Sequence, residues 1–178
     1  MNTKKLRKIL TGLAITVIGT IIAGYICSRL IKTGPPPVLE GVSFTVEEPV
    51  AAPNDKAIPI AQGGISTSFS GKCANYTAVS AKGCSIYPIV KDPSGTYWPN
   101  REIRPQLNGN WNTNIWIGNK KDKKGDRFDL FFVLVWSNSS LASKLFEDAN
   151  SHGLSNLGLN LPSRATVLCQ AQVVLDGP

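Results

Sequence analysis

Residues able to do chemistry are few and widely spaced in this 178-residue chain. Its one histidine, His152, needs an acid or amide beside it to work in a catalytic triad. It lies near the end of a predicted helix, where a solvated side chain is the simpler interpretation. The neighbouring carboxylates Glu147 and Asp148 point to different sides of that helix, so they are poor acid–base partners. The sequence therefore predicts a protein that is not an enzyme.

Metal and cofactor sites are not indicated either. Cys73, Cys84 and Cys169 are separated by eleven and eighty-five positions, which fits no zinc site. The aspartates between residues 122 and 129 stand among lysines and match no calcium-binding loop. The chain also lacks a phosphate-loop lysine motif and a GxGxxG motif. We therefore expect neither a metal nor a cofactor.

Aromatic side chains are the best candidates for contacts with a ligand. Trp116 stands between asparagines on the polar face of a predicted strand, and Tyr97 and Trp98 follow a predicted turn. Sandwich domains often bind glycans by stacking sugars on exposed rings, which is an analogy at the level of the fold. Burial beneath a loop or a helix is the alternative for each of the three. Tyr97, Trp98 and Trp116 are therefore the candidate contact residues.

A strongly basic loop is predicted at residues 118–125, which read GNKKDKKG. Such a loop has the charge to bind anionic lipid or polysaccharide. A solvated hairpin tip that blunts the edge of a sheet is the simpler interpretation.

Three cysteines fall in the part of the chain that we expect to be exported, where an oxidising environment favours disulfides. Cys73 and Cys84 enclose only ten residues, and we predict a bond between them, which adds about 2–3 kcal/mol to stability. A Cys84–Cys169 bond across the core, as in immunoglobulin-type sandwiches, is the rival pairing. Three small buried side chains without a disulfide are the third alternative.

Strand-like runs dominate the C-terminal two thirds of the chain. The last two thirds hold four clear runs, at residues 85–91, 111–117, 128–136 and 165–175. The second alternates, with Trp111 pointing inward, and the third is apolar on both faces, as in a central strand covered on both sides. Pro88 in the first run suits an edge strand or a bulge. In the last run we expect every second residue from Val167 onward to point inward, and we expect Trp136 to be buried.

One helix is predicted at Leu141–Ser151, with Ser139 or Ser140 as its N-cap. Turns are predicted at residues 92–95 and 108–109. Many short strands and one helix indicate a mainly β protein. We predict a small β-sandwich of immunoglobulin-like type, with one crossover helix before the last strand.

An uncharged stretch, Ile9–Ser28, is about long enough to span a bilayer as a helix. Four basic residues precede it and two follow it, which favours a cytoplasmic N-terminus. A cleaved signal peptide and a buried soluble helix are the alternatives, but the stretch ends without a small-x-small site. We expect a cytoplasmic tail at residues 1–8, a signal anchor at 9–28 in the cell (inner) membrane, and a periplasmic or extracellular C-terminal part.

The overall charge of +7 belongs largely to this N-terminal segment. Residues 33–178 carry thirteen basic and twelve acidic residues, a net charge of +1. The C-terminal part therefore lacks the basic surface expected of a nucleic-acid-binding domain.

Residues 29–65 are rich in proline, which fixes φ and removes a backbone donor. We predict a flexible spacer there, followed by the folded domain at residues 66–178. A short strand at Val42–Val46 that docks on the domain is an alternative within the spacer.

A set of corner and core motifs resembles a module found in bacterial membrane-associated proteins of uncharacterised function. The motifs are Tyr97-Trp98-Pro99, Asn108-Gly109-Asn110-Trp111, Ile117-Gly118, Gly125–Phe128, the FFVLV strand, Leu161-Pro162 and Ala165–Leu175. The similarity covers about residues 85–176. It implies a small immunoglobulin-like or related β-sandwich, often beside a membrane segment, and it implies no catalytic residue. The cysteines of this chain depart from the pattern.

These features together predict a single-pass membrane protein that displays a non-catalytic β-sandwich, with an envelope protein or glycan as its partner. The alternative is an accessory or effector membrane protein of a bacterial defence or toxin-type system, in which the sandwich senses and the membrane helix acts.

Overall fold

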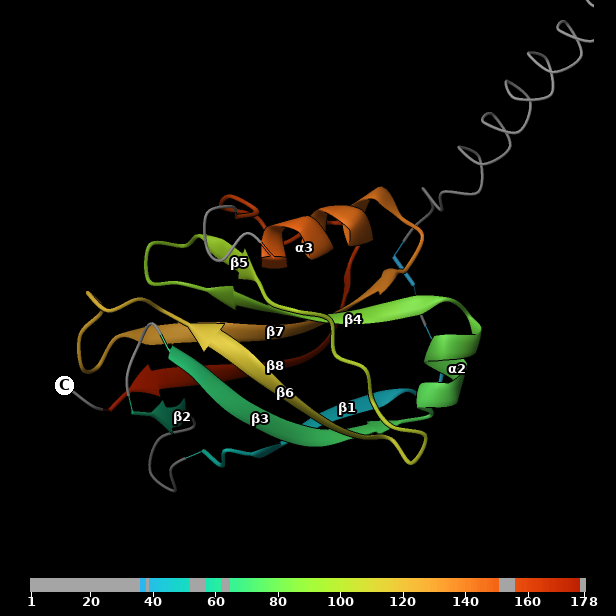
Figure 1. Cartoon of the computed structure of the whole chain (residues 1–178), viewed down its shortest axis with the longest axis horizontal. Helices are drawn as coiled ribbons and strands as arrows, with labels where there is room; N and C mark the ends of the chain where they lie inside the picture. Colours follow the sequence, from blue (N-terminus) through green and yellow to red (C-terminus); the bar gives the residue numbers. More distant parts are fainter. Residues whose placement is uncertain (1–35, 38, 52–56, 62–64, 151–155, 177–178) are drawn as a thin grey trace, which may run out of the picture. The chain divides into compact units, whose positions relative to one another are not determined.

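The structure is a computed structural model that describes residues 36–37, 39–51, 57–61, 65–150 and 156–176 (Figure 1). Eight strands and two helices form within these residues: β1 (Ser43–Glu48), β2 (Ala57–Ile60), β3 (Ile65–Ala74), α2 (Tyr76–Ala81), β4 (Cys84–Lys91), β5 (Tyr97–Pro99), β6 (Asn110–Ile117), β7 (Arg127–Trp136), α3 (Ser140–Asn150) and β8 (Thr166–Leu175). The described chain is therefore mainly β, as the sequence predicts.

The strands form two sheets. A three-stranded sheet has the order β1-β3-β6, and a five-stranded sheet has the order β2-β8-β7-β4-β5. All neighbouring strands are antiparallel except β2 and β8, which run parallel. Because β6 and β7 belong to different sheets, the segment between them passes from one sheet to the other. The hairpin predicted at residues 118–125 is therefore wrong.

The main core lies between the two sheets. Period-two alternation in β6 turns Trp111, Ile115 and Ile117 inward and leaves the asparagines of the strand outside, as predicted. The Trp111 ring is 3% exposed and stacks on Phe44 with the ring centroids 4.8 Å apart. Its indole also contacts Phe132, at 5.5 Å between centroids. The core is thus built on a cluster of three aromatic rings.

Gly71 makes room for this cluster. A Cβ atom there would overlap the carbonyl oxygen of Thr45 and lie 2.8 Å from the Trp111 ring. Only glycine therefore allows β1 and the indole to approach β3 so closely.

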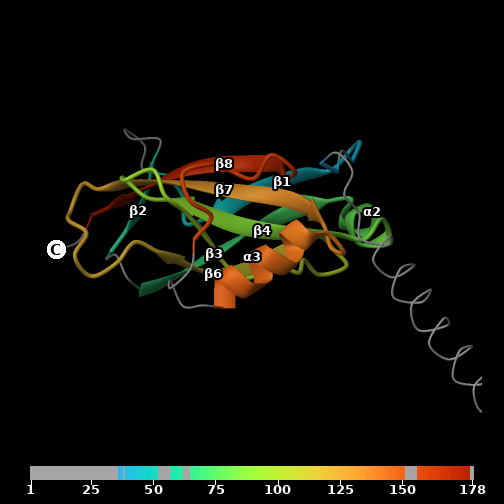
Figure 2. The same ribbon diagram turned by 90° about the horizontal axis from the view of Figure 1, so that it is seen from above.

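Central strand β7 is covered on both faces, as predicted. Phe132 and Leu134 enter the core between the sheets, whereas Val133 and Val135 lie on the outer face of the five-stranded sheet. On that outer face they form a second cluster with Leu145 and other side chains of α3. Figures 1 and 2 show α3 lying against this sheet, on the side away from β3.

Helix α3 forms where the sequence predicts it. The Ser139 Oγ atom accepts a hydrogen bond from the backbone N–H of Ala142 at 3.1 Å, which identifies Ser139 as the N-cap. The helix connects β7 to β8, which are antiparallel neighbours, so the chain leaves and re-enters the sheet at the same end. It is therefore not the crossover that was predicted. His152 lies outside the described residues.

The segment predicted as a spacer contributes two strands to the fold. β1 pairs with β3 and β2 pairs with β8, so the described domain begins well before residue 66. The docked strand considered at Val42–Val46 corresponds to β1. In β2, Ile58 and Ile60 enter the core while Pro59 faces outward. Because β2 is an edge strand, the missing N–H of this proline is tolerated.

Two further details differ from the predicted strand pattern. A bulge in β8 between its pairs with Phe132 and Val133 shifts the alternation, so Val167 is 44% exposed instead of inward. Pro88 lies in an internal strand, not an edge strand. The Pro88 carbonyl accepts a hydrogen bond from the backbone N–H of Asn100, on the β5 side. The Pro88 nitrogen, which has no hydrogen to donate, points to the same side.

No disulfide bond joins Cys73, Cys84 or Cys169 within the described residues, so the predicted Cys73–Cys84 bond is wrong. Cys73 lies in the three-stranded sheet and Cys84 in the five-stranded sheet, with α2 in the connection between them. The rival pair is also too far apart. Cys84 pairs with Trp136 on one side of β7, and Cys169 pairs with Phe132 on the other side. Because Trp136 and Phe132 are four positions apart, the two cysteines lie about 15 Å from each other, too far for a disulfide.

Among the described residues, no helix combines the length and the apolar character needed to cross a membrane. The predicted span at residues 9–28 lies outside the described residues.

Candidate functional site

The outer face of the three-stranded sheet is polar and carries one large exposed ring. We call it the Asn–Ser face; it consists of the outward residues of β3 and β6, namely Ser66, Ser68, Ser70, Lys72, Asn110, Asn112, Asn114 and Trp116. Register places these residues opposite one another, with Ser66 facing Trp116 and Ser68 facing Asn114. The face follows directly from the strand period, because the inward positions of both strands are filled by core side chains.

Trp116 is 57% exposed, although it lies on a regular strand. Its backbone N–H donates to Oδ1 of Asn100 at 2.7 Å, and its carbonyl accepts from Nδ2 of the same residue at 3.3 Å. Asn100 is buried where it follows β5, so one side chain ties the edge of β6 to the other sheet. The Trp116 backbone is therefore fixed, while its ring remains open to solvent.

A shallow depression of about 430 Å³ adjoins this face. It is lined by Ser68, Ser70 and Asn112 of this face and by the segment Glu48–Val50. The Ser68 hydroxyl donates to Oδ1 of Asn112 at 3.4 Å, which orders these two side chains. The depression offers hydroxyl and amide groups that both donate and accept hydrogen bonds.

Such a surface suits a polyhydroxylated ligand. An exposed indole offers an apolar face with a negative quadrupole, against which the C–H face of a sugar ring packs. The amide groups of Asn112 and Asn114 can donate to and accept from sugar hydroxyls. By contrast, we see no pairing of a nucleophile and a base on this face.

Tyr97 and Trp98 lie on the other sheet, so the three candidate contact residues do not share one face. Tyr97 packs on the outer face of the five-stranded sheet, with its ring 5.9 Å from that of Phe131, and its backbone pairs with residues 157 and 158. Trp98 lies opposite Val90 and donates its indole N–H to Oδ2 of Asp92 at 2.8 Å. Both rings are half-buried and engaged in internal contacts.

Asp92 organises the turn that precedes them. Burial would raise the pKa of its carboxyl group, but hydrogen bonds from Ser94, Trp98 and Thr96 outweigh burial and lower that pKa. The carboxylate is therefore a structural acceptor that holds the Trp98 ring in place.

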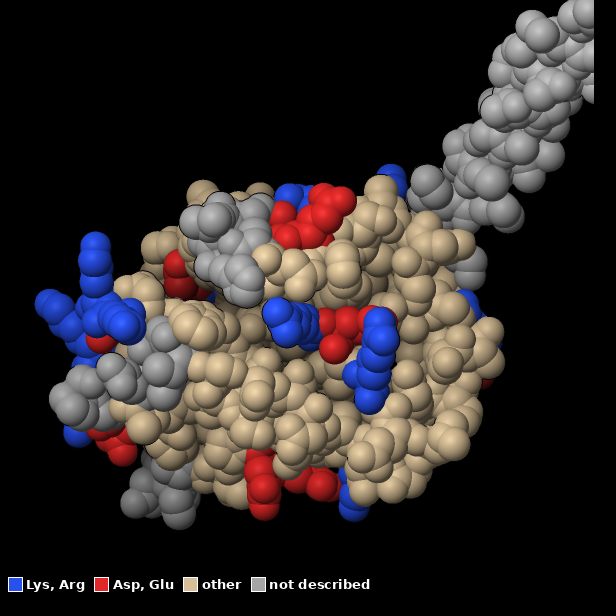
Figure 3. Space-filling view, in the orientation of Figure 1, with Lys and Arg blue, Asp and Glu red and all other residues tan. Residues whose placement is uncertain are grey.

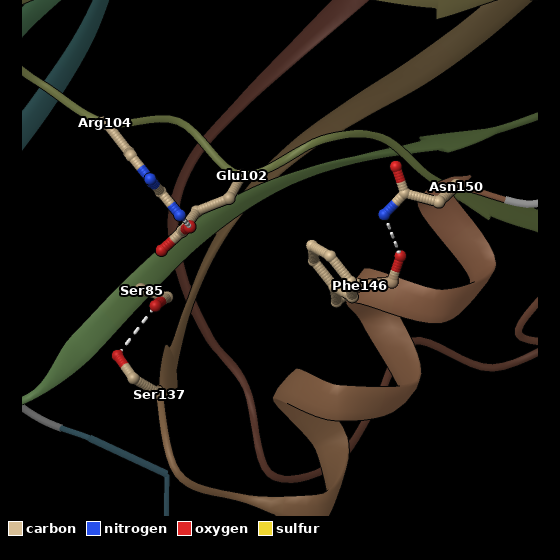
Figure 4. Close-up of polar contacts among 6 residues, drawn as sticks. All are labelled: Ser85, Glu102, Arg104, Ser137, Phe146 and Asn150. Atoms are coloured by element: carbon tan, nitrogen blue, oxygen red, sulfur yellow. Dashed lines mark hydrogen bonds and ion pairs between the residues drawn. The ribbon is translucent and has the colours of Figure 1, made fainter.

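A larger hollow, of about 590 Å³, lies elsewhere, between α2, β4, residues 102–104 and α3. Figure 4 shows the Phe146 ring pointing from α3 toward Glu102 on the far wall. Glu102 and Arg104 form an ion pair at 2.8 Å, and the hydroxyls of Ser85 and Ser137 bond to each other at 2.7 Å. The polar groups that Figure 4 draws on its walls are thus largely satisfied by one another.

Burial makes three titratable side chains poor nucleophiles: Tyr87, which lines this hollow, and Cys73 and Cys169, which lie outside it. Burial, together with the nearby Glu102 carboxylate, raises the pKa of Tyr87 to about 12, against a smaller opposing effect of Arg104. Burial also raises the pKa of the Cys73 and Cys169 thiols, which are less reactive as a result. In the described ranges no cluster of three or more histidine, cysteine or acidic residues is placed to hold a metal ion.

Sequence reasoning placed Trp116 among asparagines on a polar strand face but missed the serines that face them on β3. The serines at 66, 68 and 70 repeat at the strand period, and this repeat was the available indication of a polar face. Asn100 carries no comparable pattern, because its role depends on the approach of two strands from different sheets.

No family model matches the chain, and comparisons with curated proteins and with solved structures find no match either.

Proposed function

We propose that this protein is a membrane-anchored, non-catalytic binding module that presents the Asn–Ser face to a glycan outside the cytoplasm. The observation that carries the proposal is the exposed Trp116 ring, fixed on a strand edge within rows of asparagine and serine. A large apolar ring exposed on a rigid element is commonly a contact residue, because its burial by a ligand releases water.

The shape of the face favours an extended ligand. It is a sheet surface with a shallow depression and no deep cavity, so a polymer lying across the strands would contact more of it than a small molecule. One sugar would gain the ring contact with Trp116, and its neighbours would gain a few hydrogen bonds that replace bonds to water. Affinity for each repeat of the polymer is therefore modest and rises with the number of modules engaged.

The strand order supports an immunoglobulin-like architecture for this module. The sheet β1-β3-β6 corresponds to strands A, B and E of that fold, and β8-β7-β4-β5 corresponds to G, F, C and C′. The parallel pairing of β2 with β8 then represents a first strand divided between the two sheets. Helix α3, inserted between β7 and β8, is an addition to this pattern.

The export of the domain is supported by the sequence of the N-terminal segment. The uncharged stretch Ile9–Ser28 has the length of a bilayer span, and the basic residues before it favour retention on the cytoplasmic side. A reporter enzyme that works only outside the cytoplasm, fused after Pro178, is expected to be active. Activity of a reporter that works only in the cytoplasm would reverse this topology.

Affinity electrophoresis tests glycan binding. The full chain, in neutral detergent micelles, is run through gels containing mannan, xylan, soluble chitin derivatives or solubilised peptidoglycan fragments. We expect at least one polysaccharide to retard the wild-type chain and Trp116→Ala to abolish the retardation. Phe146→Ala is the matched control, because that ring is similarly exposed, at 59%, on α3.

Two results would contradict the proposal. The first is equal retardation of the Trp116→Ala variant and the wild type. The second is an equal loss of retardation in the Trp116→Ala and Phe146→Ala variants. Equal melting temperatures of the three proteins establish that the substitution removed a contact and left the fold intact.

A further inference from the structure

A second polar surface begins two residues after Trp116. The segment between β6 and β7, which we call the β6–β7 loop (residues 118–126), carries four exposed lysines: Lys120, Lys121, Lys123 and Lys124. In the view of Figure 3, basic side chains gather at one end of the molecule, the end at which this loop lies in Figure 1. The indole and the lysines are therefore neighbours along the chain and belong to the same end of β6.

The two acidic residues of the loop offset part of its charge, but in the described structure they form no ion pair with its lysines. The Asp122 carboxylate accepts hydrogen bonds from the backbone N–H and the side-chain amide of Asn119, at 2.6 and 2.9 Å. The Asp126 carboxylate accepts from the backbone N–H of Lys123 at 2.7 Å. Both carboxylates thus serve as acceptors for the loop backbone, and they fix its shape.

Only one of the four lysines has a partner among the described residues. Lys124 forms an ion pair with Asp176 at 3.5 Å. Within the described part of the chain, Lys120, Lys121 and Lys123 form no ion pair. The loop is also anchored, because the Gly125 N–H donates to the Leu175 carbonyl and the Leu175 N–H donates to the Asp126 carbonyl. A fixed loop thus presents three ammonium groups to solvent.

The loop lies at the opposite end of β8 from the place where the described chain begins. Thr166, the first residue of β8, donates its hydroxyl to the carbonyl of Pro37, whereas the loop bonds to Leu175, the last residue of that strand. Ten strand residues separate the two ends by about 30 Å. The loop and the point at which residues 36–37 enter the described domain are thus at opposite ends of this strand.

We propose that the glycan bound at the Asn–Ser face is an acidic polysaccharide, with a sugar stacked on Trp116 and its phosphate or carboxylate groups held by the β6–β7 loop lysines. This inference rests on the proposed function and specifies its ligand class. Ammonium groups bind phosphate and carboxylate oxygens as point charges, so the loop recognises charge density along the polymer. The binding is accordingly weakened by salt.

The test compares charged and uncharged polymers on the full chain in neutral detergent micelles. The probes are phosphomannan, a poly(glycerol phosphate) teichoic acid that carries glucose substituents, and alginate, with unphosphorylated mannan as the neutral counterpart. The triple variant Lys120→Gln, Lys121→Gln, Lys123→Gln is compared with Lys124→Gln, the control at the lysine that is already paired with Asp176.

At least one acidic polymer should bind more tightly than mannan. The triple variant should weaken that binding by about tenfold, as expected for the loss of three exposed ion pairs, while its melting temperature is unchanged. Lys124→Gln should change the affinity by less than about twofold, because the Lys124 ammonium already pairs with the Asp176 carboxylate of the same chain. Tighter binding of phosphomannan and teichoic acid than of alginate would identify phosphate as the recognised group, and the reverse order would identify carboxylate.

Several results would overturn the inference. One is that the triple variant and the wild type bind the acidic polymers with the same affinity. Another is that the wild type binds none of the acidic probes. A third is that it binds an oligo(dT) or phosphatidylglycerol vesicles more tightly than any acidic polysaccharide. If Trp116→Ala abolishes all polysaccharide binding and the triple variant changes none, only the inference about charge fails. If Trp116→Ala leaves all polysaccharide binding unchanged, both the proposed function and this inference fail.

Discussion

The outer faces of the two sheets follow the same strand alternation but meet different environments. On the five-stranded sheet the outward positions include Tyr87, Ile89 and Val133, and α3 covers them. On the three-stranded sheet the outward positions of β3 and β6 hold asparagine, serine, one lysine and one tryptophan, and no described element covers the centre of that face. Residue type at equivalent strand positions thus decides which face becomes core and which remains available to a partner.

The largest effect is expected in the core that both sheets share. Trp111→Ala should lower the free energy of unfolding by about 3–5 kcal/mol, because it removes a buried ring that contacts Phe44 and Phe132. Chemical denaturation of the wild type and the variant measures this difference. A change of a few tenths of a kcal/mol would mean that the indole is not buried between the sheets.

The next effect concerns the covered face. Leu145→Ala on α3 should lower the free energy of unfolding by about 2–5 kcal/mol, because Leu145 is fully buried against β4 and β7. Phe146→Ala, one position further along the same helix, should change it by less than about 0.5 kcal/mol. Equal effects of the two substitutions would show that α3 does not pack on the sheet through the Leu145 side.

The pH dependence of stability tests the turn that holds Trp98. The pKa of Asp92 is lowered in the folded protein by its hydrogen bonds, so its contribution is present at neutral pH and is lost as the pH falls through that lowered pKa. Asp92→Asn should therefore show a flatter loss of stability than the wild type on acidification below the ordinary aspartate range. Parallel stability curves for the two proteins would indicate that Asp92 titrates normally.

The smallest effect is expected on the uncovered face. Trp116→Ala and Asn114→Ala should each change the free energy of unfolding by less than about 0.5 kcal/mol, because neither side chain is packed in the core. Thermal unfolding of both variants measures this. A loss as large as that of Leu145→Ala would mean that Trp116 serves the fold instead of a partner.

Much of the fold is readable from local pattern. Alternation in β6, the apolar run of β7 and the serine cap of α3 each depend on neighbouring residues only, and each was predicted. Most of the errors involve long-range geometry, although the short helix α2 was also not predicted. Proline content concealed β2, whose pairing with β8 depends on a strand more than a hundred residues away, and the bulge that exposes Val167 has no local marker.

The candidate site shows the same division. The exposure of Trp116 follows from the strand period, whereas the Asn100 contact that fixes its backbone depends on the approach of two sheets. The predicted Cys73–Cys84 bond was wrong for the same reason, because a short separation in sequence did not disclose that the two residues belong to different sheets.

Backbone amide chemical-shift mapping tests the central claim most directly. The isotope-labelled full chain, in detergent micelles, is titrated with the polysaccharide that retards it most strongly in affinity electrophoresis. We predict shift changes in residues 66–70 of β3 and 110–117 of β6, together with the indole N–H of Trp116. Changes confined to β4, α2 and α3 around the hollow, with β3 and β6 unaffected, would contradict the assignment of the Asn–Ser face as the binding surface.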